Sequence, residues 1–215
     1  MLRKMKNLNL SIRNLFFSTK CSVCGKIIED DRYICYDCLK LLRRKGELKN
    51  RGNYYYLYYY EEDIRKVIAD YKLKNRKELV VEISSLVKKQ LKYLLEDKKI
   101  DIVIPVPISK KRREERGFNQ VEEILERLKI KYQQIERVKD TEHMYLLSSR
   151  ESRESNIENA FGKVELNIDG KNILLVDDIV TTGSTIREII KELKKMGKPK
   201  EIYVFSIAMA KSFGK

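Results

Sequence analysis

Hydrophobic positions in this chain recur with two different spacings, which predict strands and helices in alternation. Continuous apolar or aromatic runs indicate strands at 54–60, 101–105, 173–176 and 201–209, with a weaker one at 131–138. Apolar residues at helical spacing indicate helices at 64–71, 79–94, 122–128 and 186–196. Because strands alternate with helices, we expect an α/β fold with a mostly parallel sheet and helices on both of its faces.

A carboxylate pair and a hydroxyl-rich turn follow the most hydrophobic of these strands. Asp177 and Asp178 come directly after the run at 173–176, and the turn into the next helix contains Thr181, Thr182, Gly183, Ser184 and Thr185. Ligands bind at the carboxyl ends of parallel strands, and hydroxyls with backbone N–H groups at a helix N-terminus suit a phosphate. The carboxylates carry the same sign of charge as a phosphate, so we expect them to accept hydrogen bonds from sugar hydroxyls, with Mg²⁺ as a candidate screening ion. The alternative is an Asp-rich turn before a Thr-capped helix.

A run of cations follows the strand at 101–105. Two prolines end this strand, and the chain continues through Ser109 into Lys110, Lys111, Arg112 and Arg113, with Arg116 shortly after them. Cations at a strand end suit pyrophosphate, so we expect this run to border the phosphate site, whereas the alternative is a solvated loop. Asn119 is a candidate cap for the helix that follows.

All four cysteines of the chain stand in two Cys-x-x-Cys pairs. Cys21 and Cys24 form the first pair, and Cys35 and Cys38 form the second after ten intervening residues. This spacing suits tetrahedral thiolate ligation of Zn²⁺, and four protein ligands leave no open position for catalysis. We therefore expect a structural zinc site. Disulfides are an alternative, but no secretory signal precedes them, and a redox pair leaves the second motif unexplained.

Charge adds a candidate partner to this picture. The chain has 46 Lys and Arg residues against 32 Asp and Glu, a formal net charge of +14, of which residues 1–53 carry +8. Such a charge attracts polyanions, although solubility or a Lys-rich genome composition explains it as well. The six tyrosines at 54–60 could stack single-stranded bases. We favour a core role for them, because alternation along a strand turns half of the rings inward.

The run from Ile173 to Thr185 resembles the 5-phosphoribosyl-1-pyrophosphate (PRPP) motif of the type I phosphoribosyltransferases. The resemblance implies that Asp177 and Asp178 hold ribose hydroxyls and that residues 181–185 hold the 5-phosphate. Over nearly its whole length the chain resembles the competence protein F (ComF) family of bacterial DNA uptake. The shared features, in chain order, are the zinc module, the Tyr-rich strand, Pro-Val-Pro, Arg-Gly-Phe-Asn-Gln, Arg153-Glu-Ser-Asn156 with Phe161, and the PRPP motif. One position departs, since Met144 stands where the family usually has Gln.

The family resemblance implies a role in natural transformation, with binding of single-stranded DNA and of PRPP or a related phosphorylated ribose, beside a helicase-like translocation partner. The alternative is a catalytic phosphoribosyltransferase of nucleotide salvage, and Phe213 is then the stacking candidate for a base after the last strand. We expect a four-cysteine zinc module at 1–50 and a phosphoribosyltransferase-like domain at 51–215. The apolar run at 8–17 is broken by Arg13 and too short to cross a bilayer, so we expect a soluble, cytoplasmic protein without membrane insertion.

Overall fold

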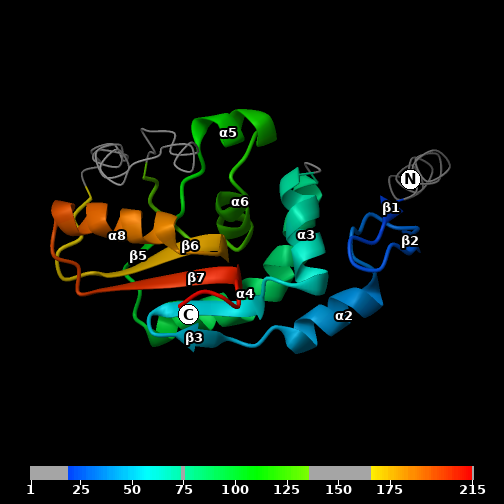
Figure 1. The fold of residues 1–215 in the computed structure, drawn as a ribbon, viewed down its shortest axis with the longest axis horizontal. Coiled ribbons are helices and arrows are strands. Elements are labelled where there is room, and N and C mark those ends of the chain that lie inside the picture. The colour runs from blue at the N-terminus through cyan, green and yellow to red at the C-terminus, as the bar shows by residue number, and fades with distance from the viewer. Residues whose placement is uncertain (1–18, 74–75, 136–165, 215) are drawn as a thin grey trace, which may run out of the picture.

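The central sheet is mostly parallel, as the alternating pattern predicts. The computed structural model describes residues 19–73, 76–135 and 166–214, and Figure 1 shows how they are arranged. Five strands form the sheet in the order β3 (Lys49–Arg51), β4 (Tyr54–Tyr59), β7 (Glu201–Met209), β6 (Asn172–Val180) and β5 (Ile102–Pro105). The hairpin of β3 and β4 is antiparallel, and the remaining neighbours are parallel. The predicted α/β class is therefore confirmed.

Helices pack on both faces of this sheet (Figure 1). One face carries α8 (Ser184–Met196), and the core of the other includes residues of α3 (Glu62–Leu73), α4 (Val80–Asp97) and α6 (Gln120–Arg127). A short 3₁₀ turn (Lys77–Leu79) precedes α4. Alternate residues of β6 serve the two cores, since Leu175 packs with α8 and Leu174 with the other helices. This double burial explains why β6 has a continuous apolar run.

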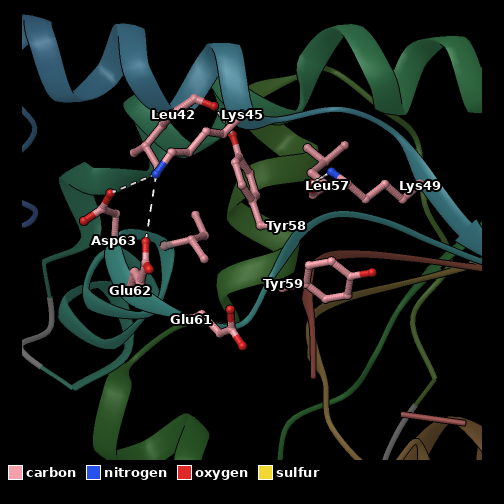
Figure 2. Close-up of a pocket in the computed structure, with 10 residues that line it drawn as sticks. Leu42, Lys45, Lys49, Leu57, Tyr58, Tyr59, Glu61, Glu62 and Asp63 are labelled. Atoms are coloured by element: carbon pink, nitrogen blue, oxygen red, sulfur yellow. Dashed lines mark hydrogen bonds and ion pairs between the residues drawn. The ribbon is translucent and has the colours of Figure 1, made fainter. Parts of the chain in front are cut away.

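The amino-terminal segment shares a hydrophobic core with the helices beneath the sheet. It consists of β1 (Thr19–Lys20), β2 (Ile27–Ile28) and α2 (Tyr36–Lys45). Leu42 belongs to the same buried cluster as residues of β4, α3 and α4, and its carbonyl accepts a hydrogen bond from the Tyr58 hydroxyl at 2.9 Å. Lys45 Nζ lies 3.6 Å from Asp63 Oδ2 and 3.9 Å from Glu62 Oε2, so an ion-pair bridge also joins α2 to α3 (Figure 2).

Several local predictions need correction. β6 does not end before the acidic pair but continues through it to Val180, because its backbone stays paired with β7 as far as Met209. α8 begins at Ser184, two residues earlier than expected. The cations after Ser109, for which a solvated loop was the alternative, lie on the short helix α5 (Lys110–Arg116), where Ser109 Oγ caps the first turn by accepting from Arg112 N at 3.3 Å.

The weaker strand expected at 131–138 is wrong where the structure describes it. Lys131–Ile135 has no strand geometry, although Gln133 N donates to Val103 O at 2.8 Å and so holds this segment beside β5. Residues 136–138 lie outside the described residues, as do Met144, Arg153, Asn156 and Phe161. In the described ranges, no helix combines the length and the apolar character that crossing a bilayer requires.

Candidate functional site

The two adjacent carboxylates lie near the carboxyl end of β6 and have different surroundings. Asp178 is 7% exposed, and its Oδ1 accepts a hydrogen bond from Lys72 Nζ at 2.7 Å. Asp177 Oδ1 accepts instead from the backbone N–H of Asp178 at 2.8 Å. Only one of the two carboxylates therefore has a cation as its partner among the contacts of the described residues.

The difference in surroundings has an electrostatic consequence. Burial raises the pKa of Asp177 to about 7, and the neighbouring charge of Asp178 adds to this rise. The ammonium of Lys72 and the backbone N–H of Asp178 act in the opposite direction but do not cancel it. Asp177 therefore exchanges its proton near neutral pH, where a carboxylic acid can both donate and accept hydrogen bonds.

The turn between β6 and α8 is held in place by its own hydroxyls and by the carboxyl-terminal segment. Gly183 has φ of 72°, a left-handed conformation that favours glycine. Thr182 Oγ1 lies 3.1 Å from Ser184 Oγ, and Arg187 Nη1 donates to Thr182 O at 2.8 Å. A Cβ at position 183 would lie 2.6 Å from Phe213 Cε2, so the glycine also allows the Phe213 ring to rest against the turn.

A cavity of about 300 Å³ opens beside the carboxyl ends of β5 and β6. Both carboxylates line it, together with Thr181 and Thr185 of the turn. The middle of the turn does not belong to this lining, since Thr182 and Ser184 contact each other and Gly183 packs against Phe213. The remaining lining residues come from the surrounding elements and are Tyr60, Lys72, Val106, Pro107, Ile108, Arg112, Arg116, Asn119, Val121 and Ile179.

The cations expected on the pyrophosphate side are divided between two cavities. Arg112 and Arg116 line the cavity of the carboxylates, whereas Lys110 and Arg113 line a neighbouring cavity of about 420 Å³. In that second cavity Arg113 Nη2 lies 2.9 Å from Glu122 Oε1. Lys111 is exposed and lines neither. Helical geometry explains the division, because residues four apart share one side of α5 while their neighbours in sequence point elsewhere.

Lys72 and Asn119 are among the cavity residues that were not anticipated as site residues. Lys72 follows the apolar stripe of α3, and its partner Asp178 is 106 residues further along the chain, so no local pattern connects the two. Asn119 was expected only as a helix cap, a role that is confirmed because its Oδ1 accepts from Val121 N at 3.0 Å. Its Nδ2 also donates to Val106 O at 3.2 Å, which fastens α6 to the end of β5.

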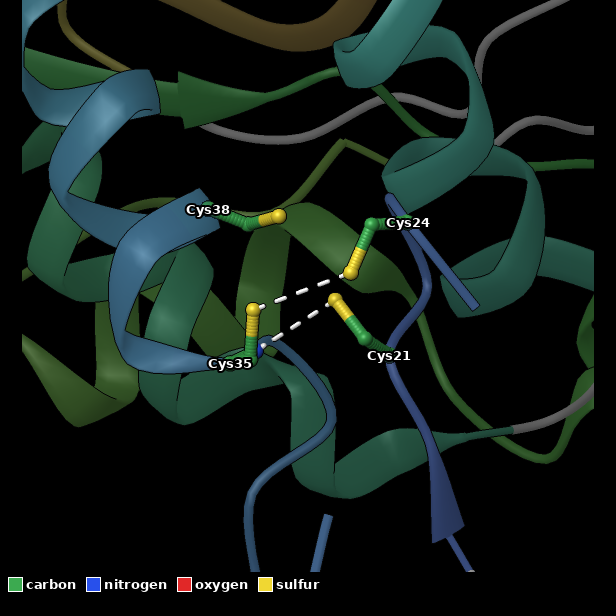
Figure 3. A group of neighbouring side chains, drawn as sticks. All are labelled: Cys21, Cys24, Cys35 and Cys38. Carbon is green, nitrogen blue, oxygen red and sulfur yellow. Dashed lines mark hydrogen bonds between the residues drawn. The ribbon is translucent and has the colours of Figure 1, made fainter. Parts of the chain in front are cut away.

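The four cysteines come together in the amino-terminal segment, as Figure 3 shows. Their Sγ atoms all lie within 4.8 Å of one another, and those of Cys24 and Cys35 are 3.8 Å apart. A tetrahedron with Zn–S bonds of about 2.3 Å has edges of roughly 3.8 Å, so the donor set fits a Zn²⁺ ion. Burial raises the pKa of the Cys21 thiol, but hydrogen bonds from backbone N–H groups outweigh burial and lower this pKa to about 7. Burial instead raises the pKa of the Cys38 thiol, so the lowered pKa belongs to Cys21 and not to the four thiols alike.

The six tyrosines at 54–60 belong to the interior rather than to the surface. Tyr56 and Tyr58 are buried, and the other four are half-buried. Tyr54 packs on Phe213 with 4.8 Å between ring centroids, and Tyr56 packs on Tyr59 at 5.4 Å. The interpretation of this run as a core strand is confirmed.

Comparisons with known proteins agree with this architecture. Residues 72–211 match the family model of the phosphoribosyl transferase domain. The chain is 30% identical over 202 residues to Competence protein F of Haemophilus influenzae, covering 88% of this chain and 84% of that protein. It is 26% identical to Competence protein ComFC of Bacillus subtilis, covering 87% and 76%, and 27% identical to the DNA utilization protein YhgH of Escherichia coli K12, covering 82% and 85%. The chain therefore belongs to the phosphoribosyl transferase domain family and, within it, to the ComF-like proteins.

Proposed function

We propose that the carboxylate cavity binds PRPP or a related phosphorylated ribose, and that the protein uses this ligand while it handles single-stranded DNA during DNA uptake. The observation that carries the first part is the composition of one cavity. Two carboxylates, Thr181 of the turn, Thr185 in the first turn of α8 and two arginines of α5 line the same space of about 300 Å³. These are the groups that a ribose, a phosphate and a pyrophosphate require.

Each group has a physical task in this proposal. Asp177 and Asp178 accept hydrogen bonds from the ribose hydroxyls, and Lys72 holds Asp178 in place through their ion pair. Thr181 and Thr185 hold the 5-phosphate together with the N-terminus of α8. The guanidinium groups of α5 hold the pyrophosphate, and Mg²⁺ bound to the ligand offsets the repulsion between phosphates and carboxylates.

The DNA part of the proposal draws on the relatives and on charge. Two of them are called competence proteins and one a DNA utilization protein, and the net charge of +14 favours binding to a polyanion. In this role the four-cysteine site holds a structural Zn²⁺ that stabilises the basic amino-terminal segment. The protein acts in the cytoplasm, where incoming DNA meets a translocation partner of the helicase kind.

Isothermal titration with PRPP, with and without Mg²⁺, tests the ligand. We expect binding to the wild-type protein and at least a tenfold loss of affinity in the Arg112→Gln, Arg116→Gln double variant, since each charge-assisted contact contributes about 1.5–3 kcal/mol. Lys111→Gln is the matched control, because this cation of the same helix lines neither cavity. A folded wild-type protein that leaves PRPP unbound would refute the proposal.

The same titration separates binding from catalysis. Released pyrophosphate in the presence of a nitrogenous base would favour the salvage phosphoribosyltransferase, whereas bound and intact PRPP favours a ligand role. Fluorescence anisotropy with a labelled oligonucleotide tests the DNA part. If phosphate contacts drive binding, the affinity should fall steeply with salt, by about 0.7 log unit per contact for each log unit of salt concentration.

A further inference from the structure

The exposed tyrosines of the described chain lie on two helices and not on the Tyr-rich strand. Tyr36, at the start of α2, is 61% exposed, and Tyr93, near the end of α4, is 58% exposed. Tyr58, at the centre of the Tyr-rich run, is only 6% exposed and keeps its hydroxyl on Leu42 O. When the side chain of a tyrosine is exposed on the surface of a basic protein, its ring can stack on a nucleic-acid base.

The two helices that carry these rings lie side by side and run in the same direction. Arg43 Nη2 on α2 is 3.2 Å from Ser85 Oγ on α4, and Gln90 Nε2 donates to Gly46 O at 3.0 Å. Residue numbers therefore rise together along the pair. The inner sides of both helices belong to one buried cluster, and the exposed residues on their outer sides flank the contacts that join the two helices. We call these outer sides the α2–α4 surface.

Cations fill the α2–α4 surface between the two tyrosines. In the ranges that the structure describes, six exposed cations on these helices form no ion pair, namely Lys40, Arg43 and Arg44 on α2 and Lys88, Lys89 and Lys92 on α4. The lysines of α4 follow Ser85 at helical spacings of three, four and seven residues and therefore continue the side on which Arg43 sits. Three exposed acidic residues stand at the two ends of the surface, Asp37 beside Tyr36 and Glu96 and Asp97 near Tyr93, and Asp97 Oδ1 accepts a hydrogen bond from the Tyr93 hydroxyl at 3.4 Å.

We propose that the α2–α4 surface is the binding track for single-stranded DNA, with phosphates on the lysines and arginines and bases stacked on Tyr36 and Tyr93. This inference rests on the DNA part of the proposed function and names the face that performs it. Tyr93 lies eight residues beyond Ser85, about 12 Å along the helix axis, and Tyr36 lies about as far on the other side of Arg43. Bases of a duplex are already stacked, so exposed rings at both ends favour a single strand over a duplex.

A charge-matched pair of variants tests the surface. The Lys88→Gln, Lys89→Gln, Lys92→Gln variant removes three cations of the α2–α4 surface. Its control, Lys194→Gln, Lys198→Gln, Lys200→Gln, removes three exposed cations from α8 and the loop after it. Helix α8 packs on the opposite face of the sheet. With labelled oligo-dT, we expect the first variant to bind at least tenfold more weakly and to lose about 2 units of the salt slope, while the control changes little.

Tyrosine variants test the stacking. Tyr93→Ala should weaken oligo-dT binding about tenfold at every salt concentration, and Tyr93→Phe should retain it, because stacking needs the ring and not the hydroxyl. PRPP titration and circular dichroism of each variant show that the fold and the other site are intact.

The outcomes separate this inference from the function on which it rests. Wild-type protein that binds oligo-dT while both lysine variants bind equally well, or equally poorly, overturns the α2–α4 surface and leaves the DNA role standing. Stronger binding of the wild-type protein to a duplex competitor than to oligo-dT overturns the single-stranded assignment. Wild-type protein that fails to bind oligo-dT at low salt removes the DNA role itself.

Discussion

Two adjacent aspartates illustrate how far the environment of a single residue decides its chemistry. Asp178 is paired with Lys72 at 2.7 Å, whereas burial and the charge of Asp178 raise the pKa of Asp177 to about 7. Both side chains line the same cavity. Asp178 thus has a cation as its partner, whereas burial disfavours the charged form of Asp177.

We predict that replacing the two aspartates has opposite effects on stability. Because the pKa of Asp177 is higher in the folded chain than in the unfolded chain, the wild-type protein loses stability as pH rises from about 4 to about 7. Asp177→Asn removes this loss and should raise the free energy of unfolding at pH 8 by on the order of 2 kcal/mol, with little effect near pH 4. Asp178→Asn should lower it, since Lys72 loses its partner. Urea unfolding at both pH values checks this, and a change of the same sign in both variants would contradict it.

A second residue-scale prediction concerns the contact between Gly183 and Phe213. Gly183→Ala adds a Cβ 2.6 Å from the Phe213 ring in a left-handed conformation, so it should destabilise the turn and weaken PRPP binding. In a Phe213→Ala background, Gly183→Ala should lower the unfolding free energy and the PRPP affinity by less. The clash with the ring is then gone, and only the strain of the left-handed backbone conformation remains. A double-mutant cycle on unfolding free energy and PRPP affinity measures the difference. Equal costs in both backgrounds would mean that the ring does not constrain the turn.

Among the secondary-structure elements, β4 shows that amino-acid composition alone does not decide whether a strand's aromatic side chains are exposed or buried. Its aromatic run could belong to a stacking platform or to a core, and the structure decides for the core because β4 lies between β3 and β7 with α2 packed against its end. The buried Tyr58 hydroxyl donates a hydrogen bond to the carbonyl of Leu42. The strand therefore links the sheet to the cysteine-bearing segment.

We expect substitutions of Tyr58 to affect stability and not DNA binding. Tyr58→Phe removes one buried hydrogen bond and should cost about 1 kcal/mol, whereas Tyr58→Ala leaves a cavity and should cost about 3–5 kcal/mol. Thermal or urea unfolding gives these values. Oligo-dT affinity of the folded Tyr58→Phe protein should equal that of the wild type, and a tenfold loss in this variant would show that the strand takes part in binding after all.

At the scale of the whole molecule, one hydrophobic cluster extends from the cysteines to one face of the sheet. Tyr33 N donates to the buried Oε1 of Glu82 at 2.8 Å, and Lys66 Nζ donates to Val23 O at 3.2 Å, so α4 and α3 hold the segment directly. Helix α3 also carries Lys72, the partner of Asp178. The same helix therefore contacts both the cysteine segment and the proposed ligand cavity.

The shared core leads to a prediction about metal removal. Cys24→Ser should lower the zinc content from about one ion per chain and reduce the stability of the chain in a single cooperative transition, because loosening the cysteine segment uncovers part of the common core. Metal analysis and calorimetry measure the two effects, with Ser22→Ala as a control beside the cluster. Two separate transitions would show that the cysteine segment unfolds by itself.

Sequence patterns determined those features of this protein that depend on neighbours along the chain. The buried run at 173–176, the cap Asn119 and the paired cysteines each express local geometry, and all of them are found in the structure. Tertiary structure decided what depends on contacts between distant segments. It joined Lys72 to Asp178, divided the cations of α5 between two cavities and buried the aromatic strand, because side-chain direction and burial follow from packing partners that lie far away in the sequence.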